Sequence, residues 1–167
     1  MRIRDEQEQD RSAVREIVSA EFDTGGEAEL VDALRAEANP RVSLVAEEDG
    51  VIIGHVMFSP VTVEEHPEEK MMGLAPLAVL YDYQGRGVGS ALVRAGLAQC
   101  RALGAHGIVV VGQPDYYPRF GFGPAARFGL TCEYDVPEDA FLALELVPGA
   151  LAGKAGKVRY HAAFGRL

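Results

Sequence analysis

The spacing of apolar residues predicts two short helices near the start of the chain. Apolar positions 14, 17, 18 and 22 fall on one face of a helix that Asp10 can cap. Positions 30, 31 and 34 resume the helical spacing after the break at Gly25-Gly26, and an Asn-Pro pair at 39–40 ends this second segment. We therefore expect two amphipathic helices to precede the sheet.

The segments that follow have the composition of β-strands. Residues 42–46 and 51–63 are rich in apolar and β-branched side chains, and residues 47–50 between them have turn chemistry, so the two runs predict an antiparallel pair. The acidic stretch 64–69 is predicted to be a loop. Residues 71–81 are almost all apolar, which is typical of a central strand buried on both faces.

A parallel crossover is predicted at the centre of the chain. Apolar positions recur at helical spacing from 88 to 103, and Gly104 ends that helix. Residues 107–112 (Gly-Ile-Val-Val-Val-Gly) then form a short β-branched strand. Strand, glycine-rich turn, helix and strand together predict a βαβ unit.

The last third of the chain predicts strands at 130–134, 141–146 and 158–164, which would finish the sheet in antiparallel fashion. No repeat or linker-like change of composition interrupts the sequence. The whole pattern predicts a single α+β domain over residues 1–167, with a mixed central sheet flanked by helices.

Composition narrows the class of protein. Hydrophobic residues make up 48% and charged residues 25%, as in soluble globular proteins, and the N-terminus is charged rather than apolar. No apolar run approaches the roughly 18 residues that a membrane span needs, so we expect a cytoplasmic protein. The two cysteines, Cys100 and Cys132, lack the spacing of metal ligands, so we expect buried thiols and no metal site.

The net charge limits the partners. Sixteen basic and 25 acidic residues give a formal charge of −9, which opposes attraction to phosphate backbones and makes nucleic acid an unfavourable partner. Acidity can attract a cationic amine, but it also serves solubility alone. Charge therefore does not name the substrate.

The strongest chemical signal is the turn Gln84-Gly85-Arg86-Gly87-Val88-Gly89, which joins the apolar strand to the helix. Backbone N–H groups without helical partners and the helix dipole converge on such a turn, and glycines let a phosphate approach closely. A Walker loop requires a Lys after the turn, and none follows here. A dinucleotide fingerprint requires Gly or Ala where Ser90 stands, and an acid about 20 residues on, where 108–112 has none.

A third pattern, Gln84-x-x-Gly87-x-Gly89 after a buried strand, resembles the GNAT superfamily of acyl-CoA-dependent N-acetyltransferases. Residues 74–80 resemble the fourth strand of that family, residues 107–112 its fifth strand, and 116–122 (Tyr-Tyr-Pro-Arg-Phe-Gly-Phe) its tyrosine-bearing segment. The resemblance covers roughly residues 40–125. It implies a sheet splayed between the fourth and fifth strands, with acetyl-CoA as the co-substrate. Tyr81 departs from the family, which commonly has proline there.

The resemblance also implies the cofactor-binding residues. The pantetheine arm would pair with the fourth strand at a bulge, for which the interrupting Pro76 is suited, and the backbone N–H of Val79 would donate to the thioester oxygen. The residues expected to contact the cofactor, the first three through their backbone alone, are Leu77, Ala78, Val79, Gln84, Gly85, Arg86, Gly87, Val88, Gly89 and Ser90.

Tyr117 precedes Gly121-Phe122 by the usual family spacing and resembles the tyrosine that protonates the departing thiolate, so we prefer it to Tyr116 as a catalytic residue. Packing against neighbouring aromatic rings is the alternative role for both tyrosines. No general base stands out. His55 shares a strand face with Met57 and Ser59 and is a candidate for the acceptor groove, but a histidine in a strand is more often a packed residue of the sheet.

The predicted function is direct transfer of an acetyl group from acetyl-CoA to an amine, on a small molecule, a peptide N-terminus or a lysine. A non-catalytic acyl-CoA sensor would keep residues 84–89 without needing Tyr117, and a nucleotide-binding protein could use the same turn. The chain is expected to be a monomer or a homodimer, since the strand at 158–164 could pair within the chain or with a partner's edge.

Overall fold

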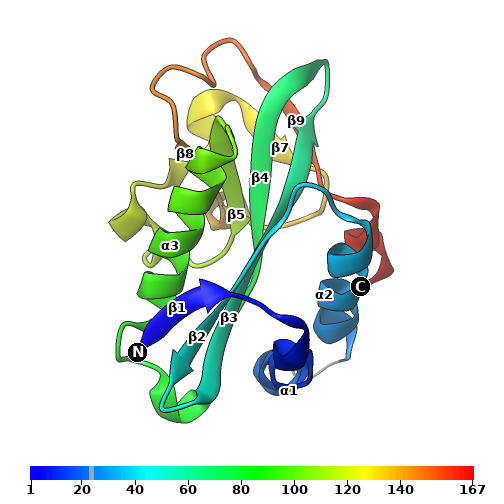
Figure 1. Ribbon diagram of the computed structural model, residues 1–167. Helices are drawn as coiled ribbons and strands as arrows, with labels where there is room; N and C mark the ends of the chain where they lie inside the picture. The colour runs from blue at the N-terminus through cyan, green and yellow to red at the C-terminus, as the bar shows by residue number, and fades with distance from the viewer. Residues whose placement is uncertain (23–24) are drawn as a thin grey trace.

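The computed structural model describes residues 1–22 and 25–167 as an α+β fold built on one mixed sheet (Figure 1). Three α-helices are found in the described residues: α1 (Arg11–Phe22), α2 (Gly26–Glu37) and α3 (Val88–Ala102). The strands are β1 (Arg2–Asp5), β2 (Val42–Glu48), β3 (Val51–Val63), β4 (His66–Val79), β5 (Gly107–Val111), β6 (Gly123–Pro124), β7 (Leu130–Cys132), β8 (Phe141–Glu145) and β9 (Gly156–Arg159).

The strand order is β1-β2-β3-β4-β5-β8-β6. Two strands lie outside this path: β9 pairs with β3, and β7 pairs with β9. Strands β4 and β5 are parallel and are connected through α3, whereas β1 to β4 pair antiparallel in chain order. The predicted βαβ unit and mixed sheet are therefore confirmed. Within the described residues, no helix has the length and apolar character that a membrane crossing requires.

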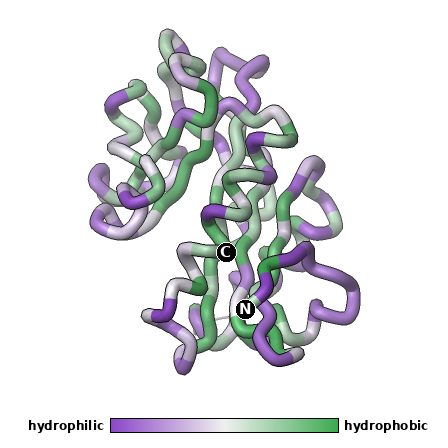
Figure 2. The backbone as a smooth tube through the Cα atoms, turned by 60° about the vertical axis from the view of Figure 1, so that its left-hand side comes forward, coloured by the Kyte–Doolittle hydropathy of each residue, from purple (hydrophilic) through white to green (hydrophobic). Residues whose placement is uncertain are grey.

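The helices cover opposite faces of the sheet (Figure 1). On β3, Val56 and Phe58 belong to the core cluster that contains the apolar stripe of α3, while Met57 packs with α1 and α2. Because side chains alternate across a strand, both faces of this region must be apolar. Figure 2 shows the result, with hydrophobic strands inside and hydrophilic loops at the surface.

The predicted acidic loop at 64–69 is wrong in extent. Val63 pairs with His66, so only Glu64 and Glu65 form the turn, with Glu65 at a φ of 69°, and β4 already begins at His66. The carboxylate of Glu69 is buried and lies 2.9 Å from Nδ1 of His106. A polar partner thus makes the acidic sequence compatible with a strand.

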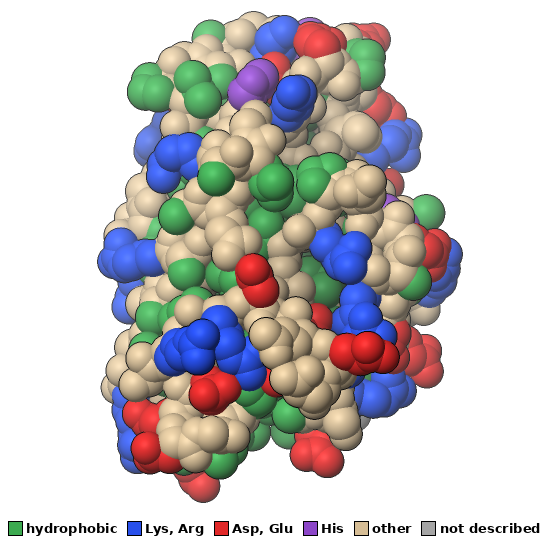
Figure 3. All heavy atoms as spheres, viewed as in Figure 1, with side chains coloured by type: hydrophobic (Ala, Val, Ile, Leu, Met, Phe, Trp, Pro, Cys, Tyr) green, Lys and Arg blue, Asp and Glu red, His purple; other side chains and the backbone are tan. Residues whose placement is uncertain are grey.

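The charged start of the chain was not predicted to be regular, yet it forms β1 at the edge of the sheet. The guanidinium of Arg4 bonds the carboxylates of Asp10 and Glu47 at 2.7 and 2.8 Å. These contacts, together with antiparallel pairing to β2, replace the apolar burial that the segment lacks. On the face in Figure 3, acidic and basic side chains are intermixed over the lower half, where β1, α1 and α2 lie in Figure 1.

The end of the chain differs from the prediction. Strands β7 and β8 fall within the predicted ranges 130–134 and 141–146, but β9 ends at Arg159, and Ala162–Arg166 is a 3-10 helix. Strand β9 pairs antiparallel with β3 inside the same chain, whereas β7 pairs parallel with β9. The prediction that the whole tail is antiparallel was therefore wrong for β7.

Candidate active site

The sheet opens between its two central parallel strands. Residues Met71 to Leu74 of β4 pair with Gly107 to Val110 of β5, and no pairing between these strands follows in the described residues. Against β3, Leu74 pairs with Phe58 and Leu77 with Val56, so β4 carries one extra residue between them. This bulge bends β4 away from β5 and leaves its last residues with one unpaired edge.

Backbone direction along this edge follows from one hydrogen bond. The N–H of Leu80 donates to the carbonyl of Ile53 on β3 at 2.9 Å. Since backbone groups alternate in direction along an antiparallel strand, Ala78 also turns toward β3, while Leu77 and Val79 direct their N–H and C=O groups to the open side. This alternation favours Leu77 and Val79 over Ala78 for contact with a ligand in the opening.

The glycine turn beside the opening has the geometry of an anion site. Gly85 and Gly87 have φ angles of 74° and 83°, in the left-handed region that favours glycine, and α3 begins directly afterwards. No side chain caps the helix N-terminus, and its first turn contains no acidic residue. The N–H groups of Val88, Gly89 and Ser90 are consequently available to an anion, and the helix dipole favours one there.

The opening and the turn border one cleft of about 670 Å³, within the usual range for ligand sites. The side chain of Arg86 does not line it; its guanidinium lies 5.3 Å from the ring centre of Tyr83. Ala78 is buried against the side of α1 and α2. The predicted residues that line the cleft are Leu77, Val79, Gln84, Gly85, Gly87, Val88, Gly89, Ser90 and Tyr117.

Tyr117 and Tyr116 take different positions in the cleft. Tyr117 is 8% exposed and packs edge to face on Phe122, and burial raises the pKa of its hydroxyl to about 12. Among the described residues no group hydrogen-bonds this hydroxyl, which is not sealed from the cleft. The hydroxyl of Tyr116 instead lies 3.4 Å from Oγ of Ser90, at the first turn of α3.

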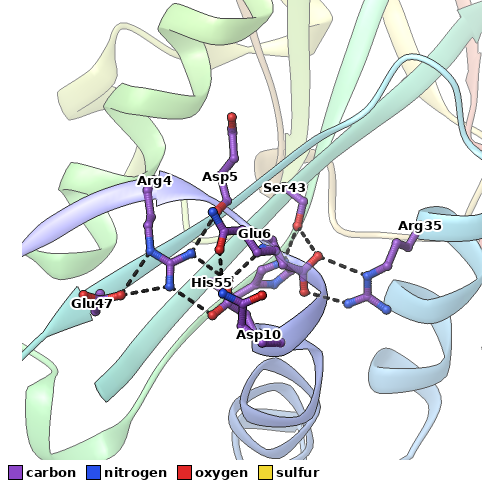
Figure 4. A network of polar contacts seen from close by, with 10 residues as sticks. Arg4, Asp5, Glu6, Asp10, Arg35, Ser43, Glu47 and His55 are labelled. Atoms are coloured by element: carbon purple, nitrogen blue, oxygen red, sulfur yellow. Dashed lines mark hydrogen bonds and ion pairs between the residues drawn. The ribbon is translucent and has the colours of Figure 1, made fainter. Parts of the chain in front are cut away.

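His55 lies away from the cleft, which confirms that it is a packed residue of the sheet. Its Nε2 is 2.9 Å from Oγ of Ser43, which donates to the carboxylate of Glu6, and Glu6 pairs with Arg35 (Figure 4). Ser43 uses its proton on Glu6, so Nε2 of His55 must carry the proton of the neutral ring. Burial lowers the pKa of His55 to about 4.

Several cleft residues were missed because they come from distant segments. Glu21 and Phe22 end α1, Glu27 and Leu30 belong to α2, and Phe164 lies in the C-terminal 3-10 helix. None of them stands in a local motif. No pattern in the sequence near these residues marks them as part of a ligand site.

The cysteine prediction holds for one residue of two. Cys100 is fully buried, and burial raises the pKa of its thiol to about 12. Cys132 is half-buried, so the expectation of a buried thiol is wrong there, although partial burial still raises its pKa. Neither residue lines the cleft described above.

A sheet opened between parallel strands, with an uncapped helix N-terminus beside the opening, suits an elongated ligand that carries phosphate groups. The sequence matches the acetyltransferase (GNAT) family over residues 11–122. The uncharacterized N-acetyltransferase YhbS of Escherichia coli strain K12 is 38% identical over 168 residues, with full coverage of both chains. The chain therefore belongs to the GNAT family of N-acetyltransferases.

Solved structures agree with this assignment. A crystal structure of Escherichia coli YhbS in complex with CoA has a TM-score of 0.92 and 37% identity, covering 99% of this chain and 92% of that one. A GNAT acetyltransferase from Brucella melitensis in complex with acetyl-CoA has a TM-score of 0.79 and 40% identity, covering 98% and 97%. These likenesses confirm the α+β GNAT fold with flanking helices.

Proposed function

We propose that the cleft binds acetyl-CoA and that the protein transfers the acetyl group directly to an amine. The pyrophosphate would accept hydrogen bonds from the N–H groups of Val88, Gly89 and Ser90, and the pantetheine arm would run along the open edge at Leu77 and Val79. The complexes of related proteins with CoA and acetyl-CoA support this assignment.

The chemistry requires a donor to the thioester oxygen, a neutral amine and a proton donor for the departing thiolate. The N–H of Val79 donates to the thioester oxygen and stabilises the negative charge that develops when the amine attacks the carbonyl carbon. An acceptor that arrives as an ammonium first releases one proton to water, because only the neutral nitrogen attacks. The carbon–nitrogen bond forms, the carbon–sulfur bond breaks, and Tyr117 gives its proton to the departing thiolate. The nitrogen then loses its second proton to water, and Tyr117 is reprotonated from water. A pKa of about 12 keeps Tyr117 protonated at neutral pH, so it is in the form that an acid requires.

The acceptor end of the cleft is acidic and apolar. The carboxylate of Glu21 and the side chain of Glu27 lie in the cleft walls together with the apolar side chains of Phe22, Leu30 and Phe164. Carboxylates attract an ammonium group, and apolar walls favour the hydrocarbon that carries it. We infer that the acceptor is a primary amine on a small molecule or a peptide, presented as a cation.

The main support for this proposal is that the unpaired edge of β4 and the uncapped start of α3 border the same cleft. The test is release of CoA thiol from acetyl-CoA in the presence of primary amines and of peptides with free N-termini or lysines. Amine-dependent release with formation of the acetylated amine supports transfer. Tight acetyl-CoA binding without release for any amine class would favour the sensor function instead.

A further inference from the structure

A second basic feature adjoins the cleft at Arg119. Its Nε donates to the carbonyl of Tyr116 at 2.7 Å, and its guanidinium carbon lies 4.3 Å from the centre of the Tyr116 ring. Arg119 is exposed and lines the cleft. No carboxylate among the described residues forms an ion pair with it, so its charge is not neutralised by a neighbouring acid.

Arg94 lies near Arg119, against the second ring of the same aromatic pair. It follows Ser90 by one helical turn of α3, and its guanidinium carbon is 5.0 Å from the ring centre of Phe120. The rings of Tyr116 and Phe120 meet edge to face with centres 5.4 Å apart. Two guanidinium groups thus rest on one aromatic pair, and Arg94 also lacks a carboxylate partner in the described part of the chain.

The aromatic pair connects these cations to the predicted pyrophosphate site. The hydroxyl of Tyr116 reaches Oγ of Ser90 in the first turn of α3, while Arg119 stacks on the same ring. Only the side chain of Tyr116 therefore lies between the guanidinium of Arg119 and the helix N-terminus. In CoA, a single ribose separates the pyrophosphate from the 3′-phosphate, so the two spans correspond.

We propose that Arg119 and Arg94 bind the 3′-phosphate of CoA and make the protein discriminate against cofactors that lack it. The inference rests on the proposed binding of acetyl-CoA. A phosphate monoester carries about −1.5 to −2 charges near neutral pH. The acidic chain repels such a group, and stacked guanidinium forks with no competing carboxylate are suited to hold it.

The contrast with Arg86 sharpens the assignment. Arg86 belongs to the glycine turn and stacks on Tyr83, but it does not line the cleft. Arg119 lines the cleft, and its Nε bond to the Tyr116 carbonyl fixes the plane of the guanidinium while the terminal nitrogens remain available. Arg94 does not line the cleft itself and adds a second positive charge on the same aromatic pair. The basic residue in the sequence motif is therefore not the one that this inference selects.

The test is a calorimetric titration of the full chain with CoA and with 3′-dephospho-CoA. The natural protein should bind CoA at least about tenfold more tightly, as expected for hydrogen bonds to a charged group. The double variant R94Q/R119Q should bind the two ligands within about twofold, because it loses affinity for CoA alone. Arg101→Gln, an exposed charge change at the other end of α3, should keep the wild-type ratio.

The titrations distinguish the 3′-phosphate site from acetyl-CoA binding itself. Equal binding of the two ligands by the natural protein, or an unchanged ratio in the double variant, would overturn the 3′-phosphate site while leaving acetyl-CoA binding intact. No binding of either ligand would overturn the proposed function itself. If the double variant does not fold, Arg119→Lys serves in its place, since it keeps the charge but loses the fork and should lower the ratio.

Discussion

The Nε2 atom of Gln84 lies 3.0 Å from the carbonyl oxygen of Val79, so the first residue of the glycine turn is bonded to the last residue of β4. The same amide lies 3.2 Å from a carboxylate oxygen of Glu21 at the end of α1. One exposed side chain thus links the strand, the turn and the end of α1 at the cleft.

Replacing Gln84 with Ala should weaken acetyl-CoA binding by roughly fivefold, because about 1 kcal/mol of hydrogen bonding that holds the turn to the strand is lost. The matched control is Gln99→Ala, which removes a 3.0 Å bond to Asp5 far from the cleft. Titration calorimetry checks both variants. Equal affinities for the two would contradict a role of the Gln84 bond in organising the site.

Gly87 and Gly104 permit a paired experiment on the turn. Their φ angles are 83° and 85°, and an added Cβ would meet no atom within 4 Å at either position. Alanine at each should therefore cost a similar backbone strain of about 1–2 kcal/mol in the free energy of unfolding. Only Gly87→Ala should also weaken acetyl-CoA binding. A matching loss of affinity in Gly104→Ala would show that the effect is one of stability.

Tyr117→Phe should lower the rate of acetyl transfer by about 100-fold or more while acetyl-CoA affinity stays within about twofold, because the proton donor is lost but the ring packing remains. Tyr134→Phe is a control at a tyrosine that does not line the cleft. Rates are measured by thiol release with an amine that the natural protein accepts. Full activity of the Tyr117 variant would remove its role as an acid.

The buried His55 should make stability depend on pH. Its pKa falls from 6.5 to about 4 on folding because burial opposes the charged ring, so the unfolded chain binds the extra proton in that interval. Stability should therefore be complete above pH 6.5 and decrease as pH falls toward 4, by up to about 1.4 kcal/mol per pH unit.

Urea unfolding between about pH 5 and pH 7.5 checks this dependence. The variant His55→Gln keeps an N–H donor for Ser43 but does not titrate, so its stability should change less over the same interval. The slope against pH, rather than the absolute stability, is the readout. Equal slopes in the two proteins would assign the pH dependence to other groups.

Much of the site was predictable because the residues that form it are close together in the sequence. The glycine turn, the apolar strand before it and the helix after it are adjacent in sequence, and their propensities agree. The bulge was expected from the resemblance to the family, and Pro76, which cannot donate a ladder hydrogen bond, fits it. The roles assigned to Tyr117, Val79 and the turn residues remain predictions.

The remainder depends on contacts between distant segments. Glu21 and Phe164 enter the cleft only through tertiary packing, so no local pattern marks them. Strand β1 has little apolar character of its own and is held by β2 and by the ion pairs of Arg4. The start of β4 was taken for a loop because the pairing of Glu69 with His106, 37 residues away, is invisible in the sequence pattern.

The most direct measurement is a thermal unfolding titration with acetyl-CoA, with ATP and NAD as controls. Ligand at about 100 times its dissociation constant adds about 2.7 kcal/mol, which should raise Tm by roughly 5–10 °C for a domain of this size. If acetyl-CoA binds in the cleft, a saturating shift with acetyl-CoA alone is expected. No shift in a folded sample free of copurified CoA, or an equal shift with ATP, would contradict acetyl-CoA binding in the cleft.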